Sequence, residues 1–212
     1  MMTATATDQR PAGRPRKPPG APTHRPITEQ IRYADSKKWV RALNHADLAL
    51  GQPMTVFVTI QWKLAPSAMP EPERVSDLLN SLGGWLRYRT GRPAVWAYSR
   101  EAGERKGVHL HLMVNVPDDL FDDFALAVNR WVEARAVSFL PKAVDVRPIT
   151  QQTFKTLRGY HLKEGDARTV NNYVDLKKHR ADARNIPVAG KRLGFSHAIG
   201  PEAQRRHAQP NI

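Results

Sequence analysis

The alternation of apolar and polar positions predicts four β-strands in the middle of the chain. In "MTVFVTIQW" (54–62), Val56, Val58 and Ile60 recur at every second residue and therefore share one face of a strand. The same period marks three further segments, "PAVWAYSREA", "KGVHLHLMVNVP" and "KAVDVRPI" (93–102, 106–117 and 142–149). We expect each of these strands to place apolar side chains on one face and a different set on the other.

Apolar residues at helical spacing predict helices between and around the strands. The three- and four-residue spacing typical of an amphipathic helix appears in 71–91, in 117–137, and outside the strands in 27–50 and 150–166. The central order is then strand, helix, strand, strand, helix, strand. This order predicts an α+β fold, a ferredoxin-like split β-α-β-β-α-β palm whose antiparallel sheet is backed by helices.

Composition separates one domain from two basic ends. Residues 1–26 combine Pro, Gly and Arg without apolar periodicity, so they bury too little surface to offset the entropy of ordering. We expect a disordered basic tail at 1–26 and a domain at 27–176 with its core in 54–166. Beyond it we expect a basic, irregular extension at 177–212.

The chain carries a large excess of positive charge. Among its 212 residues, 33 are Lys or Arg and 20 are Asp or Glu, which gives a net charge of +13. So basic a protein attracts polyanions, of which nucleic acid is the commonest in cells. Cysteine is absent, which excludes disulfides and thiolate metal sites. Because no apolar run is long enough to span a bilayer and no signal-peptide core is present, we expect a cytoplasmic protein without a membrane segment.

Two histidines lie on the same face of the strand predicted at 106–117, opposite its apolar face. His109 and His111 point the same way, which is typical either of a solvated polar face or of a metal site. A tight hairpin before this strand would bring Glu101 beside His109 as a third ligand. Two imidazoles and a carboxylate suit Mn²⁺, Mg²⁺, Co²⁺ or Zn²⁺.

A tyrosine and a lysine share one face of the predicted helix at 150–166. Tyr160 and Lys163 are three residues apart, and a nearby ammonium lowers the cost of ionising a phenol. A phenolate beside a divalent metal is equipped to attack a phosphodiester. A second candidate pair, Tyr173 and Lys177, lies four residues apart in "NNYVDLKK".

Taken together, these motifs resemble those of the HUH endonuclease superfamily. "GVHLHLMV" is similar to its histidine motif, "YHLKEGD" to its tyrosine motif, and "VFVTIQW" to its first strand, so the resemblance covers about residues 54–166. It implies that His109, His111 and Glu101 hold a divalent cation, Mn²⁺ or Mg²⁺. It further implies that Tyr160 is the nucleophile and that Lys163 holds the phenolate's charge or screens the phosphate.

The order of the motifs along the chain favours particular groups within this superfamily. The histidines precede the tyrosine, as in rolling-circle replication initiators and single-tyrosine transposases. The resemblance implies a plasmid- or phage-type initiator that nicks single-stranded DNA or an origin hairpin, leaves a 5′-phosphotyrosine and a free 3′-hydroxyl, and later rejoins the strand. A host helicase and a host polymerase would then unwind the DNA and extend the 3′-hydroxyl. The alternatives are a single-tyrosine transposase and a non-catalytic basic DNA-binding protein.

Overall fold

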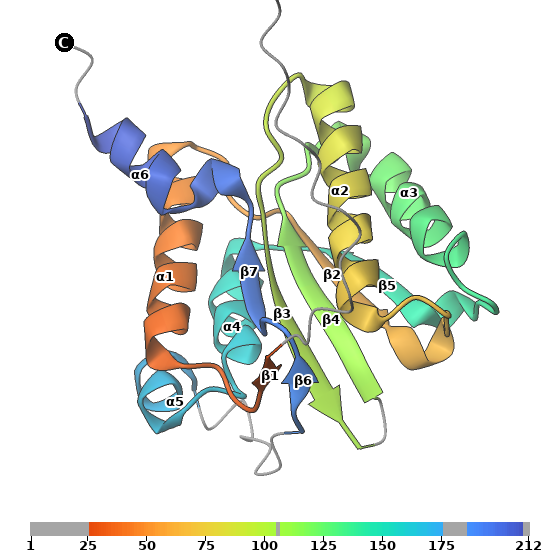
Figure 1. The fold of residues 1–212 in the computed structure, drawn as a ribbon. Helices are drawn as coiled ribbons and strands as arrows, with labels where there is room; N and C mark the ends of the chain where they lie inside the picture. Colours follow the sequence, from red (N-terminus) through yellow and green to blue (C-terminus); the bar gives the residue numbers. More distant parts are fainter. Residues whose placement is uncertain (1–25, 105–106, 176–185, 210–212) are drawn as a thin grey trace, which may run out of the picture.

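The chain folds into an α+β structure built on a five-stranded antiparallel sheet (Figure 1). The computed structural model describes residues 26–104, 107–175 and 186–209. The strand order is β5-β2-β4-β3-β7, so β4 lies at the centre between β2 and β3. The strands are β2 (Val56–Gln61), β3 (Trp96–Gly103), β4 (Gly107–Val114), β5 (Val144–Pro148) and β7 (Leu193–Phe195).

Four of the five strands are those that the apolar alternation predicts. The central register pairs Val58 with Leu112 and Ile60 with Leu110. All four side chains are fully buried on one face, which confirms the predicted face of both strands. The order β5-β2-β4-β3 is compatible with the expected split arrangement.

Helices α2 (Glu71–Thr90) and α3 (Phe121–Glu133) cover this apolar face (Figure 1). Their buried stripes include Leu82 and Phe124, which have no exposed surface. Helix α2 ends at Gly91, whose φ of 67° is the left-handed conformation that a glycine C-cap supplies without a steric penalty.

The opposite face of the sheet is covered by α1 (Tyr33–Asn44) and α4 (Gln151–His161), and α5 (Ala167–Tyr173) packs beside α1 (Figure 1). A second apolar cluster forms here around Trp39 and Leu162, with Met113 contributed by the sheet. The helix predicted at 27–50 is therefore α1, extended by a π-helical turn. Short helical turns occupy His45–Ala49, Trp62–Leu64, Asp118–Leu120, Pro141–Ala143 and His197–Ile199.

Helix α4 begins where the sequence predicts but ends earlier. Its N-cap is Thr150, whose hydroxyl accepts a hydrogen bond in the first turn. The helix stops at His161 rather than near Gly165. Beyond it, Ile31 N–H donates to the carbonyl of Glu164 at 3.0 Å and Ile31 forms a β-bridge with Gly165. Residues 162–164 form a turn, and the pairing of Gly165 with Ile31 replaces a further turn of helix.

The sequence predicts irregular structure after residue 177, and this prediction is wrong for residues 186–209. There β7 joins the sheet beside β3, β6 (Val188–Ala189) pairs with β1 (Ile27–Thr28), and α6 (Pro201–Ala208) follows. Two buried arginines fix this segment: Arg100 donates to the carbonyl of Ala189 at 2.7 Å, and Arg192 donates to the carbonyl of Thr28 at 3.1 Å. Strands of two or three residues are too short to show a period in the sequence.

The expected disordered tail at 1–26 lies, except for Pro26, outside the described residues. Among the residues that the structure does describe, no helix combines the length and apolarity needed to cross a bilayer.

Candidate metal centre

The hairpin of β3 and β4 places Glu101 directly opposite His109. His111 lies two residues further along β4, so the three side chains project from the same face of the sheet. Glu101 Oε2 is 3.1 Å from His109 Nε2 and 3.4 Å from His111 Nε2. The structure thus brings together the three residues that the sequence proposes as ligands, here called the trio.

Each imidazole is oriented through its other nitrogen. His109 Nδ1 is 3.1 Å from the carbonyl oxygen of Gly107, a contact that turns its Nε2 toward Glu101. His111 Nδ1 is 3.1 Å from the hydroxyl oxygen of Thr59 on β2. Partners of this kind fix the ring orientation of metal-ligating histidines. Both Nε2 atoms face Glu101 as a result.

Burial contradicts the alternative of a solvated polar face. Glu101, His109 and His111 are 1%, 6% and 3% exposed, because α4 packs over this part of the sheet. Glu101 Oε1 and His111 Nε2 are buried without a hydrogen-bond partner among the described residues. Such atoms are costly unless something else binds them. A cation between the ligands would satisfy both.

The donor set also fits a divalent cation. One ligand atom from each residue of the trio lies within 4.8 Å of the other two. In the described ranges, no other group of three or more His, Asp or Glu side chains is arranged in this way. A nitrogen and oxygen set without thiolates suits ions of the Mn²⁺ and Mg²⁺ type as well as Zn²⁺.

The protonation states match those that metal binding requires. Burial alone would raise the pKa of Glu101, but the neighbouring His109 and His111 imidazoles and the charge of Lys163 hold that pKa well below its ordinary value. Burial lowers the pKa of His111. Glu101 is therefore a carboxylate and His111 a neutral imidazole at neutral pH, and these are the forms that bind metal ions.

Lys163 and Tyr160 lie against the trio. Lys163 Nζ is 2.9 Å from Glu101 Oε2 and 3.8 Å from the centre of the Tyr160 ring. The Tyr160 ring meets His111 edge-on, with 5.0 Å between ring centroids. Because α4 ends at His161, Lys163 lies in the turn that follows rather than on the helix itself. The predicted proximity of the two side chains holds nonetheless.

The expected effect of Lys163 on Tyr160 needs a correction. Burial and the negative charge of Glu101 raise the pKa of Tyr160, and Lys163 offsets them only in part. The phenol is therefore protonated at neutral pH. Because the Tyr160 side chain is buried beside the Glu101 carboxylate, the site does not favour the phenolate.

A third histidine, which the sequence analysis missed, lies under the trio. His161 is fully buried, and its Nδ1 is 2.8 Å from the hydroxyl of Ser99 on β3. Its ring centroid is 6.0 Å from that of His111, and burial lowers its pKa to about 3. The contact anchors α4 to the sheet directly beside Tyr160. In the sequence, the only indication of this role is that His161 directly follows Tyr160 in "YHLK".

The second tyrosine candidate lies elsewhere. Tyr173 on α5 stacks against Tyr33 of α1, with ring centroids 6.1 Å apart. Burial and the neighbouring Tyr33 raise its pKa. Its proposed partner, Lys177, is outside the described residues. Tyr160, and not Tyr173, contacts His111.

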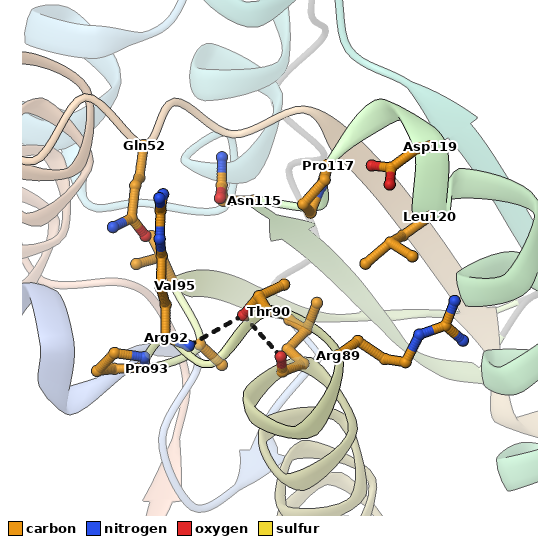
Figure 2. Close-up of a pocket in the computed structure, with 12 residues that line it drawn as sticks. Gln52, Arg89, Thr90, Arg92, Pro93, Val95, Asn115, Pro117, Asp119 and Leu120 are labelled. Atoms are coloured by element: carbon orange, nitrogen blue, oxygen red, sulfur yellow. Dashed lines mark hydrogen bonds between the residues drawn. The ribbon is translucent and has the colours of Figure 1, made fainter.

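A separate cavity of about 280 Å³ lies at the other end of β3 and β4 (Figure 2). Gln52, Arg89, Arg92 and Asn115 contribute polar groups to its wall, and Asp119 adds a carboxylate. No member of the trio lines it. The cavity and the candidate metal centre are therefore distinct features of the fold.

Comparison with known proteins assigns no relative. The chain matches no protein-family model, and no curated protein sequence is significantly similar to it.

Proposed function

We propose that this protein is a metal-dependent endonuclease of the HUH type that nicks single-stranded DNA through Tyr160. The observation that carries the proposal is the buried trio with Tyr160 and Lys163 against it. A scaffold gains nothing from burying two imidazoles and a carboxylate, since burying charge in place of apolar groups is rarely stabilising. The strand order β5-β2-β4-β3 supports a ferredoxin-like palm as the framework.

The proposed reaction is a phosphoryl transfer to the tyrosine. A divalent cation, when held by the trio, would polarise the scissile phosphate and stabilise its developing charge. Tyr160 would lose its proton to solvent, and its oxygen would form a bond to phosphorus. The bond between phosphorus and the 3′-oxygen would break, and that oxygen would take up a proton. The products are a 5′-phosphotyrosine and a free 3′-hydroxyl.

The charge of the chain supports a nucleic-acid substrate. A net charge of +13 attracts the phosphate backbone, and the resulting affinity should fall steeply with salt. The covalent intermediate conserves the energy of the phosphodiester bond, so rejoining would need no ATP. As a replication initiator of plasmid or phage type, the protein would depend on host helicase and polymerase for unwinding and synthesis.

The test is capture of the covalent intermediate. The full chain is incubated with Mn²⁺ and a random pool of single-stranded oligonucleotides labelled at the 3′ end, because a 5′-phosphotyrosine retains the 3′ fragment. We expect a labelled adduct that survives denaturing electrophoresis. Tyr160→Phe should abolish it and Tyr173→Phe should leave it unchanged. An adduct that survives Tyr160→Phe would overturn the assignment, and the absence of any adduct from the native chain, on random and hairpin DNA alike, would favour a non-catalytic DNA-binding protein.

A further inference from the structure

Three nitrogen atoms converge on a single oxygen of the trio. Glu101 Oε2 is 2.9 Å from Lys163 Nζ, 3.1 Å from His109 Nε2 and 3.4 Å from His111 Nε2. The other oxygen of the carboxylate, Oε1, is buried without a hydrogen-bond partner among the described residues. The ammonium therefore occupies the side of the carboxylate that faces both imidazole Nε2 atoms.

A divalent cation bound by both imidazoles and Glu101 must lie close to this same oxygen. Its two charges would then stand within a few ångströms of the Lys163 ammonium. Repulsion between charges at such separations amounts to several kcal/mol at an effective dielectric constant of about 20. The cation and the ammonium thus compete for Glu101.

We propose that Lys163 is a positioning residue shared between two partners: it neutralises Glu101 when the centre holds no metal ion, and it leaves Glu101 and stays with Tyr160 alone when a divalent cation takes over that role. The exchange itself requires only the metal centre, whereas its consequence for Tyr160 rests on the proposed function. The exchange extends the proposed function, because it makes the pairing of Lys163 with the nucleophile Tyr160 depend on whether the trio binds a cation.

The distance that Lys163 must travel is short. Its Nζ already lies over the Tyr160 ring, 3.8 Å from the ring centre, and hydrogen-bonds the Tyr160 side chain. Lys163 also stands in the turn after α4, where its backbone is not part of the helix. Rotation about side-chain bonds is enough to leave Glu101 and remain on Tyr160.

The identity of the residue favours exchange over a permanent structural pair. Two other acids that lie largely out of solvent, Glu71 and Glu164, pair with Arg100 and Arg192, and both arginines also hold backbone carbonyls. Arginine makes several fixed hydrogen bonds at once, whereas lysine is a mobile point charge. The carboxylate of the metal centre is paired with the displaceable cation.

The experiment measures metal affinity in the absence of DNA. Mn²⁺ binding to the full chain is followed by calorimetry and by the electron paramagnetic resonance of the free ion. Lys163→Met keeps most of the side-chain volume but removes the competing charge, so Mn²⁺ should bind at least about tenfold more tightly than to the native chain. The matched control is Lys155→Met, at an exposed lysine of α4, which should change the affinity less than about twofold.

Lys163→Gln is a second neutral variant that can still donate a hydrogen bond to Glu101, in case the methionine disturbs folding. It too should bind Mn²⁺ more tightly than the native chain. Unchanged or weaker binding by a folded neutral variant overturns the exchange, as does the absence of Mn²⁺ binding from every variant. Tighter binding by the variants, together with a native chain that forms no DNA adduct, would establish the exchange and refute the nuclease function.

Discussion

Strand β4 contributes to two buried faces of very different character. Leu110 and Leu112 pack under α2 and α3, whereas the intervening His109 and His111 pack under α4. Both faces are shielded from solvent, so exclusion of water alone does not explain the difference. One face gains stability from apolar burial. The other pays desolvation for groups that a simple core does not need. The proposed function is therefore assigned to this polar face rather than to the apolar one.

The largest effects are expected from substitutions at two neighbouring residues of β4, one on each face of the sheet. Leu112→Ala should lower the free energy of unfolding by about 2–5 kcal/mol, because it leaves a cavity in a packed core. His111→Ala should weaken Mn²⁺ binding about 100-fold or more, because it removes one of three ligands. Chemical denaturation and calorimetry measure the two quantities. A folded His111→Ala variant that binds Mn²⁺ as tightly as the native chain would remove the distinction between the faces.

A smaller effect should come from the partner that orients His111. Thr59→Val removes the hydroxyl 3.1 Å from His111 Nδ1, and loss of such a partner typically weakens metal binding about 10- to 100-fold. Thr55→Val on the approach to the same strand removes a hydroxyl bonded to the carbonyl of Val116 at 2.7 Å. This control should cost stability, about 1 kcal/mol, with no change in metal affinity. Equal metal affinities for the two variants would argue against orientation through Thr59.

The smallest effect is a pH dependence confined to the polar face. Burial lowers the pKa of His161 from 6.5 to about 3. Its neutral form therefore contributes stability fully above pH 6.5, and this contribution is lost as the pH falls, because the unfolded chain takes up the proton first. The slope is at most about 1.4 kcal/mol per pH unit.

His161→Asn keeps a polar group near Ser99 but does not titrate. Unfolding of this variant between pH 6.5 and 4.5 should show a shallower loss of stability than the native chain. Comparing the two slopes isolates His161 from other groups, such as Glu164, whose pKa burial raises to about 7. Parallel slopes would mean that His161 is already accessible to protons in the folded state.

Local periodicity was sufficient to predict most of the sheet and the ligands of the candidate centre. Alternation of two residues assigned both faces of β4, and a hairpin between two adjacent strands left little freedom in how Glu101 meets His109. Contacts made over long sequence separations escaped prediction. The pairing of Ile31 with Gly165 and the anchoring of residues 186–192 by two buried arginines leave no periodic trace.

Within the site, too, local spacing could be predicted from the sequence, whereas effects of tertiary packing could not. The closeness of Tyr160 to Lys163 follows from their spacing, but the balance of charges around them does not. Burial and Glu101 raise the pKa of Tyr160, an effect that depends on how deeply α4 covers the sheet. The role of Ser99 as a partner of His161 depends on the same packing. Sequence spacing identifies neighbours, and tertiary burial decides their protonation.

The central claim is that Tyr160 beside the trio is the nucleophile, and peptide mass spectrometry tests it most directly. The full chain is allowed to react with Mn²⁺ and single-stranded DNA, then digested with nuclease and trypsin. Trypsin separates the two tyrosines into "GYHLK" (159–163) and "TVNNYVDLK" (169–177). The account predicts a nucleotide-phosphate mass increase on Tyr160 in the first peptide, dependent on Mn²⁺ and abolished by a chelator. A modified Tyr173, or an adduct formed equally well without a divalent cation, would contradict it.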